Sequence, residues 1–561
     1  MNATAGASGL AGSGTGGGQH AGGATGNAGS SNSNAGNTGT TGGTQGVAGT
    51  TGTAGTTGSA GAGGTTGTAG STGSAGAGGA IVVDVGQSVT QRGGDSARTA
   101  HWVQSAFTTA NVSKMALDAN FKATFTGEMT AVPLFLASTT PGAGTFFAVT
   151  TQNNVYALDE TTGATKWMHS IGAQLTGGPG PGIGNRGIVS TPVIDPVGRV
   201  IYMAAAMAAG RHEIHALSVD TGAEVAGWPV DVSKVTSGAT TFNFTDQNQR
   251  SALSLVNGIV YVAFGDYYGD GGNYHGWVVS VNATDPTKVA GWATMGGQEG
   301  IWASGGMASD GNGVFAVTGN SGANNRTNTD SEEVIRITGM SVPNRDNNNL
   351  FYPDIWQSGM NNGDKDFGSC SPSVITVPNS TPSKIIVAPA KPGRVYFLDA
   401  AKLGGATGQF ADIVVAGTGS ESVYTAPTSY QSASGTFVAI STQIDSACPG
   451  GQSSGNIMGL LMQPGTPPMP QIKWCASMNS GDDEVRRRSP ISTNSSAAGA
   501  DPVVWFMSGS NLVAFNGETG AAIPFTSGTC DGVHRFTSPI AANGRIIVGG
   551  NGHLCSWSVH Q

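Results

Sequence analysis

The first 80 residues contain no Asp, Glu, Lys, Arg or Pro, and Gly, Ala, Thr and Ser make up nearly all of them. Such a segment lacks the apolar surface that would offset the entropic cost of ordering it. A collagen triple helix is excluded, because Gly does not recur at every third position and Pro is missing. We therefore expect residues 1–80 to form a disordered, low-complexity tether and residues 81–561 to form one folded domain.

The sequence also lacks any run of about 20 apolar residues, so no transmembrane segment is expected. Its net charge of −9 excludes the basic field on which general nucleic-acid binding depends. No signal peptide is visible, because the N-terminus has neither a charged region nor an apolar region behind it. Since a long uncharged tether suits a crowded cell envelope, we expect an extracytoplasmic protein that is secreted, periplasmic or tethered to the surface.

Cysteine is scarce, and the five cysteines form no CxxC or CxxCH motif. This spacing excludes c-type haem attachment and clustered metal sites, so we expect no haem. In an oxidising compartment, Cys448 would pair with Cys475 and Cys530 with Cys555, leaving Cys370 over. The alternative is five buried free thiols.

From residue 130 onward, a unit of roughly 50 to 65 residues repeats eight times. Each unit opens on a small residue, often before Pro, and continues into three short β-branched or aromatic runs that Gly, Asn and Asp separate. This pattern predicts an all-β, eight-bladed propeller in which neighbouring blades cover each other's faces. The openings lie at 130–136, 189–194, 250–255, 303–308, 371–376, 425–430, 488–493 and 537–542.

The chain ends just after the third strand of the eighth unit, so the fourth strand of that blade has to come from elsewhere. The segment FKATFT at 121–126 precedes the first opening and is the natural donor. A ring closed by both ends of the chain would protect its sheet edges. We therefore predict that a strand near 121–126 closes the propeller, which we expect to be a monomer.

Two units carry a phrase after the third strand, ALDETTGATKW at 157–167 and ALSVDTGAEVAGW at 216–228, with a weaker copy at 514–523. The phrase resembles the tryptophan-docking repeat of the quinoprotein propellers, which use pyrroloquinoline quinone. DSARTAHW at 95–102 and IWASGGMASDGNG at 301–313 are similar to a bacterial envelope branch of quinoprotein-like propellers. The resemblance implies the quinoprotein alcohol dehydrogenase-like fold and a packing role between blades for Trp167, Trp228, Trp292 and Trp474.

The resemblance also implies where such enzymes hold pyrroloquinoline quinone and Ca²⁺: an early carboxylate, an Asn in a GTGN-type turn and a catalytic Asp. The Gly-Asn of VTGN places Asn320 at the second position, and Asp330 is a candidate for the third. The place of the early carboxylate falls near Met207, a poor ligand for a hard cation. The vicinal Cys pair of the family is also missing, which puts a dehydrogenase in doubt.

Loop length distinguishes the two faces of the predicted ring. The face on which each first strand begins, the top face, carries the longest loops, at 265–276 in blade 3 and 319–333 in blade 4. The opposite, bottom face carries the short Thr-Gly turns. Because long loops more often carry function, we expect the ligand site on the top face near blades 3 and 4.

The blade 3 loop sets Asp266, Asp270 and Asn273 close together in a Gly-rich stretch. Oxygen ligands at such spacing can hold Ca²⁺, although Asx turns that cap a tight loop explain the same residues. His275 is a candidate general base beside Asp270, or a hydrogen-bonded residue at the start of a strand.

Residues just before the first strands should surround the mouth of the channel. A basic arc there could bind a carboxylated or phosphorylated ligand, or an organic cofactor, because guanidinium groups match such anions in a bidentate way. The alternative is that these arginines pair with acidic residues and join blades. The candidates are Arg186, Arg250, Trp302, Arg488 and Arg535.

These observations favour a non-catalytic binding or scaffold module for a small anionic molecule, a glycan or an envelope protein. A dehydrogenase of alcohols or sugars that depends on pyrroloquinoline quinone and Ca²⁺ is the alternative, with Asn320 and Asp330 as its metal ligands. A polysaccharide lyase or hydrolase that uses His275 and Asp270 is a second alternative.

Overall fold

A computed structural model of the whole chain describes the folded part nearly throughout. The described residues are 88–177, 185–266, 272–416, 422–444, 448–449, 455–478 and 487–560. They belong to one compact unit, Gly78–Gln561. The predicted tether, residues 1–80, lies outside the described residues, as does Asp270. None of the helices in the described part combines the length and hydropathy that a membrane span requires.

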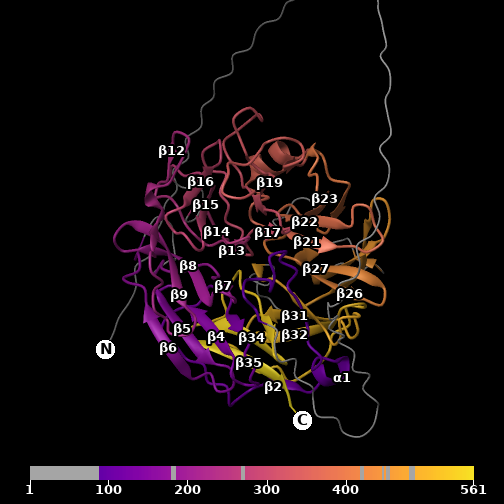
Figure 1. Cartoon of the computed structure of the whole chain (residues 1–561). Coiled ribbons are helices and arrows are strands. Elements are labelled where there is room, and N and C mark those ends of the chain that lie inside the picture. Colours follow the sequence, from indigo (N-terminus) through magenta and orange to yellow (C-terminus); the bar gives the residue numbers. More distant parts are fainter. Residues whose placement is uncertain are drawn as a thin grey trace, which may run out of the picture. The chain divides into compact units, whose positions relative to one another are not determined.

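Eight sheets stand around a central axis, which confirms the predicted eight-bladed propeller (Figure 1). Every innermost strand falls within or directly beside one of the predicted openings, where β-branched and apolar residues follow a small residue or Pro. These strands are β3 (Leu134–Leu136), β7 (Val193–Asp195), β13 (Ser254–Val256), β17 (Ala308–Ser309), β21 (Ser373–Thr376), β26 (Thr428–Ser432), β30 (Ile491–Asn494) and β33 (Ile540–Ala542).

The second and third strands of each blade are antiparallel and almost entirely buried, which places the core between adjacent blades. The second strands are β4 (Thr145–Val149), β8 (Val200–Met207), β14 (Ile259–Phe264), β18 (Val314–Val317), β22 (Lys384–Ala390), β27 (Gly435–Ile444), β31 (Val503–Ser508) and β34 (Arg545–Gly550). The third strands are β5 (Asn154–Asp159), β9 (Arg211–Ser218), β15 (Trp277–Asn282), β19 (Val334–Ile337), β23 (Arg394–Asp399), β28 (Gly455–Gln463), β32 (Asn511–Asn516) and β35 (His553–Val559).

Outer strands complete most blades: β6 (Thr165–Ser170), β10 (Val230–Asp231), β16 (Val289–Ala293), β20 (Leu350–Tyr352), β25 (Ala411–Val414) and β29 (Met469–Ala476). The remaining elements are short connections outside the regular blades. They are α1 (Thr109–Val112), η1 (Val232–Lys234), β11 (Thr236–Ser237), β12 (Thr240–Thr241), η2 (Trp356–Met360) and η3 (Asn361–Gly363). A further strand, β24 (Gly405–Ala406), pairs parallel with β20 at the edge of blade 4.

Tryptophans of one blade dock on the Thr-Gly turn of the next. The indole nitrogen of Trp167 in blade 1 donates to the carbonyl of Val219 in blade 2 at 3.0 Å. A Cβ atom on Gly222 would lie 2.6 Å from this ring, so the turn requires glycine. Trp474 repeats the arrangement with the carbonyl of Gly517 at 2.7 Å. The packing role that the resemblance implies for these tryptophans is therefore confirmed.

The strand that closes the ring is β2 (Met115–Leu117), which pairs antiparallel with β35 in blade 8. The prediction that residues 121–126 supply this strand is wrong. That segment contributes one bridge, between Thr124 and His553, while the amide of Phe125 donates to the carbonyl of Gly552. The chain path explains the difference: β2 runs along the C-terminal half of β35, and residues 123–125 reach only its N-terminal end, at Gly552–Leu554.

The chain between residues 88 and 104 lies inside the ring and is called the plug (Figure 1). Its backbone exchanges hydrogen bonds with the innermost strands of six blades, at Phe135, Ile194, Ser309, Val374, Ser429 and Ser492. Within it, β1 (His101–Val103) pairs parallel with β30. Nothing in the repeat pattern predicts this plug, because it belongs to no blade.

Both predicted disulfides are present, with Cα–Cα distances of 5.9 Å for Cys448–Cys475 and for Cys530–Cys555. Cys370 is the free cysteine and is buried, as expected. Burial raises the pKa of its thiol far above the ordinary range, so this thiol is unreactive in the folded protein.

Candidate functional site

Three backbone segments of blades 3 and 4 run side by side at the top of the channel. The amide of Ile301 donates to the carbonyl of Phe264 at 3.1 Å, and the amide of Gly319 donates to Gly300 at 3.0 Å. The amide of Glu299 donates to the carbonyl of Asn320 at 2.9 Å. Since Asp266 follows this pairing on the blade 3 side, the structure brings Asp266 and Asn320 to one wall.

The indole of Trp302 forms the centre of that wall. Cβ atoms added to Gly265 and Gly319 would lie 2.8 Å and 2.7 Å from the ring, so both positions need glycine for close approach. Asp266 and Asn320 directly follow these glycines and therefore flank the indole. Trp302 itself is only 6% exposed.

Blade 5 contributes the third side of the site through the loop that precedes β21. The indole nitrogen of Trp302 donates to Ser369 Oγ at 3.4 Å, and Ser369 Oγ donates to Asp366 Oδ2 at 2.8 Å. Lys391 Nζ lies 3.5 Å from Asp366 Oδ2 and 3.2 Å from Asp364 Oδ1. Asp366 and Lys391 are both buried, so this ion pair is shielded from solvent.

A buried carboxyl group, Glu332, lies behind Asp366. Its Oε2 accepts from the amide of Phe367 at 2.5 Å, and its Oε1 is buried without a hydrogen-bond partner among the described residues. Burial, and then the nearby charge of Asp366, raises the pKa of Glu332 well above its usual value. Its φ of 56° is a strained conformation for a residue with a side chain, of the kind that accumulates at functional sites.

Replacing Glu332 with Gln should make the pH dependence of stability flatter. A carboxyl group whose pKa is raised by folding stabilises the protein below the unfolded pKa, and this contribution is lost as the pH rises. The amide keeps an acceptor for Phe367 and has no proton to lose. Urea unfolding should therefore show Glu332→Gln gaining stability relative to wild type between pH 4.5 and pH 7.5.

The exposed Glu128, replaced with Gln, is the matched control and should track the wild type at both pH values. If the free energy of unfolding changed with pH in the same way for Glu332→Gln and Glu128→Gln, the result would contradict the presence of a buried, unsatisfied carboxyl group at Glu332.

The donors of this wall suit a hard divalent cation. Asp266 and Asp366 offer carboxylate oxygens and Asn320 offers an amide oxygen, which are the ligand types that Ca²⁺ prefers. Two carboxylates balance the charge of such an ion, and Lys391 leaves a positive charge beside it. Met207, near which the resemblance places the early carboxylate, lies in β8 and contacts Asn153.

Asp330, the predicted metal ligand or catalytic residue, lies beside this wall, because its amide donates to Glu299 Oε2 at 3.0 Å. Its carboxylate is bound in a bidentate way by Arg345, with Nε–Oδ1 and Nη2–Oδ2 distances of 2.6 and 2.7 Å. The amide of Met295 adds a third bond, at 2.7 Å. These donors hold both oxygens in a buried ion pair between neighbouring loops.

The predicted cluster of the blade 3 loop is also divided. The amide of Asn273 donates to Asp246 Oδ2 at 3.0 Å, so the Asp246 carboxylate holds the backbone of this loop. His275 Nδ1 lies 3.0 Å from the carbonyl of Thr294, which gives it the structural role that was the alternative interpretation. Its predicted partner Asp270 lies outside the described residues.

The predicted basic arc is not one surface. Arg488 donates to the carbonyls of Met507, Gly509 and Val533 and so joins blades 7 and 8. Arg535 is exposed, and Arg186 is buried at the start of blade 2. Arg488 therefore joins blades, as the alternative interpretation holds, but these three partners are carbonyl oxygens and not the acidic residues of that interpretation.

Arg250 is the one predicted arginine that lies on the Trp302 wall. Its Nε donates to the carbonyl of Trp302 at 3.1 Å, and its guanidinium lies 5.8 Å from the centre of that indole. It also lies 5.7 Å from the ring of Phe536 in blade 8, across the channel. Arg250 and Phe536 therefore cover the wall from the top.

Sequence reasoning missed Lys391 and Glu332. Lys391 ends the apolar run KIIVAPAK. A lysine at the end of a buried strand needs an acidic partner, so its position in the sequence could have indicated a buried ion pair. Glu332 gave no such signal, because its burial depends on how the loops of blades 4 and 5 meet.

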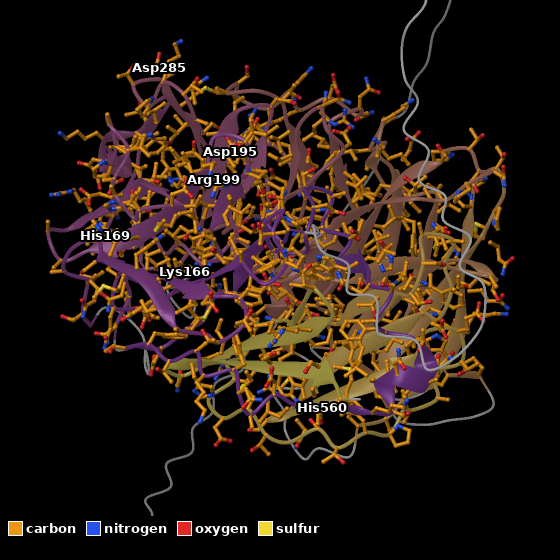
Figure 2. The ribbon with its side chains drawn as sticks, turned by 60° about the horizontal axis from the view of Figure 1, so that its bottom comes forward. Lys166, His169, Asp195, Arg199, Asp285 and His560 are labelled. Atoms are coloured by element: carbon orange, nitrogen blue, oxygen red, sulfur yellow. A yellow bond between two sulfur atoms is a disulfide. The ribbon has the colours of Figure 1, made fainter. Side chains whose placement is uncertain are left out.

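A groove of about 450 Å³ between blades 1 and 2 opens on the bottom face and has no comparable free chemistry (Figure 2). Arg199 forms a bidentate pair with Asp220, with a Nε–Oδ2 distance of 2.7 Å. Lys166 Nζ donates to the carbonyl of Gly144 at 2.7 Å. Because the charges that line this groove are already paired, the top face remains the candidate site.

No protein-family model matches the chain, and no curated protein matches its sequence. Solved structures do match its fold. The quinohemoprotein alcohol dehydrogenase of Comamonas testosteroni is 14% identical, with a TM-score of 0.54, over 84% of this chain and 80% of that one. A quinohemoprotein alcohol dehydrogenase of Pseudomonas putida HK5 is 13% identical, with a TM-score of 0.55 and the same coverage.

A europium-containing methanol dehydrogenase is similar at 13% identity and a TM-score of 0.54, over 83% of this chain and 90% of that one. The chain has the quinoprotein-like propeller fold. The fold that the resemblance of the repeats implied is thereby confirmed, and identities this low show the fold alone.

Proposed function

We propose that this propeller binds a divalent cation, with Ca²⁺ as the preferred ion, together with a small anionic molecule in the top half of its channel. The observation that carries the proposal is that Asp266 and Asn320 directly follow the two glycines packed on the indole of Trp302, to which Asp366 is linked through Ser369. Asp266, Asn320 and Asp366 come from three successive blades, so the ring has to form before the set exists. The two disulfides support an extracytoplasmic location.

The anionic character of the second ligand follows from the cations at the wall. Lys391 is buried beside Asp366, and Arg250 lies over Trp302. A carboxylate next to the bound cation could recruit both groups, and a planar ligand could replace Arg250 on the indole face. This is the binding module favoured from the sequence, with its ligand class narrowed to small carboxylated molecules.

Calorimetric titration of metal-stripped protein with Ca²⁺ tests the proposal directly. We expect one saturable site, and Asn320→Ala should weaken it because the variant removes one oxygen ligand without adding charge. The matched control is Asn273→Ala, which removes an amide from the predicted loop but not from the Trp302 wall. Equal affinities for the two variants, or no binding by wild type, would refute the cation site.

A dehydrogenase that uses pyrroloquinoline quinone and Ca²⁺ is the second candidate. It is favoured by the fold shared with alcohol and methanol dehydrogenases and by the third oxygen donor, Asp366, at the Trp302 wall. When bound, the quinone would supply the electron acceptor. Asp366 would take the proton of the substrate hydroxyl, and Lys391, 3.5 Å away, would stabilise its carboxylate beforehand.

Reconstitution separates the two candidates. Protein given pyrroloquinoline quinone and Ca²⁺ should reduce an electron-accepting dye in the presence of primary alcohols or sugars if the second candidate is right. Cation binding without quinone binding would leave the first alone. Polysaccharide cleavage is not proposed, because the described residues around His275 give it a structural hydrogen bond and no acidic partner.

A further inference from the structure

The plug carries two buried guanidinium groups with very different surroundings. Arg98 donates to the carbonyls of Arg92, Met307 and Leu253 at 2.6, 3.0 and 2.8 Å, and to Ser254 Oγ at 2.7 Å. Its guanidinium N–H groups thus donate to four acceptors, and Arg98 joins the plug to blades 3 and 4. Its role is structural.

Arg92 has no comparable set of partners. It is 3% exposed, and within the described part of the chain its guanidinium makes one hydrogen bond, from Nη2 to Ser489 Oγ at 3.2 Å. No described carboxylate forms an ion pair with it. Burial and the charge of Arg98 lower its pKa to about 9, so the group stays protonated at neutral pH. A buried cation without a counter-charge is costly, which points to an anion that completes the site.

Hydroxyl groups on the neighbouring blades surround the partner of Arg92. Ser489 precedes the inner strand of blade 7, accepts from the amide of Ala426 at 3.3 Å and donates its own amide to the carbonyl of Thr537 at 3.1 Å. Thr425, beside Ala426, and Thr537 therefore flank it from blades 6 and 8. Both have buried Oγ1 atoms without a hydrogen-bond partner among the described residues. A buried hydroxyl group of this kind can donate a hydrogen bond to a bound ligand.

We propose that Arg92, Thr425 and Thr537 form a binding site for a small oxyanion, a carboxylate or an inorganic oxyanion, inside the central channel. A guanidinium supplies parallel N–H donors that match a carboxylate, phosphate or sulfate, and two hydroxyls can complete the coordination. The site uses no residue of the Trp302 wall and requires no metal. It therefore stands independently of the proposed function.

Thermal unfolding in EDTA tests this site, with oxalate and inorganic phosphate as separate probes. The melting temperature of wild type should rise in a saturable way, by about 2 to 5 °C at concentrations far above the dissociation constant. Arg92→Met should lose this rise. In buffer without either anion it should melt at or above the wild-type temperature, because it removes an uncompensated buried charge.

Arg199→Met is the matched control, since Arg199 is half-exposed on the bottom face and paired with Asp220. It should keep the full response to the anions. A response to oxalate alone would identify carboxylates as the ligand class, and a response to phosphate alone would identify inorganic oxyanions.

Three results would overturn the proposal: no saturable response in wild type, an unchanged response in Arg92→Met, or a large loss of stability of Arg92→Met in buffer without the anions. The last result would mean that Arg92 is already satisfied by the fold. As a second test that leaves the guanidinium in place, Thr425→Val with Thr537→Val should weaken the response at least tenfold. A response unchanged in that double variant would be equally decisive against the site.

Discussion

Arg98→Met should lower the free energy of unfolding by about 3 to 5 kcal/mol, the range for disrupting a buried and fully bonded charge. The side chain is 1% exposed and holds four acceptors from the plug and from blades 3 and 4. Methionine fills part of the space but removes the donor to the carbonyls of Arg92 and Leu253, whereas the carbonyl of Met307 still accepts from Ser254 Oγ. Urea unfolding monitored by tryptophan fluorescence measures the loss.

Arg199→Met is again the control, because its exposed ion pair with Asp220 should be worth no more than about 1 kcal/mol. Equal stabilities for Arg98→Met and Arg199→Met would show that the plug is not needed to hold the ring. A loss confined to Arg98→Met would instead make the channel segment part of the folding unit, although it belongs to no blade.

The blades could be predicted because their information is local. Each innermost strand follows a small residue or Pro and is short, apolar and bounded by turns, and this pattern repeats at every blade. The packing of Trp167 between blades could be predicted for the same reason. The repeat contains a Thr-Gly turn and a tryptophan at a fixed spacing, and Trp167 packs on Gly222 of such a turn. The two disulfides followed from pairing cysteines that are close in sequence.

The closing strand and the plug could not be predicted in detail, because each depends on contacts between distant parts of the chain. Residues 115–117 and 121–126 are both plausible strands by composition, and only their register along β35 in the folded ring distinguishes them. Arg98 contacts residues more than 150 positions away, which no periodic pattern records.

The site was predicted in part, because the repeat determines the place of some of its residues and contacts between distant segments determine the place of the others. Asp266 and Asn320 follow the second strands of adjacent blades, so the repeat itself places them at one height. Asp330 was favoured by its distance along the chain from Asn320, but the loop carries it to Arg345. Asp366 comes from the next blade, and its link to Trp302 through Ser369 appears only in three dimensions.

Asp366→Asn should weaken Ca²⁺ binding about 100-fold, which corresponds to about 2.7 kcal/mol. The substitution preserves the volume of the side chain and leaves an oxygen that can accept from Ser369. It removes one of the negative charges that offset the charge of the ion, and it leaves Lys391 without its buried partner. The propeller should lose stability as well, because a buried lysine loses its partner, so calorimetry on the folded variant measures the affinity and urea unfolding measures the stability separately.

Asp364→Asn is the sharpest control, because Asp364 contacts the same lysine at 3.2 Å but is 65% exposed and makes no described contact with the Trp302 wall. If the cation lies between Asp266, Asn320 and Asp366, only the Asp366 variant loses affinity. Asp366 would then bind the cation directly, whereas Asp364 only contacts Lys391. Equal losses in both variants would mean that the charge of Lys391 alone sets the affinity. The cation would then have to lie outside the Trp302 wall, and both candidate functions would lose the site on which they depend.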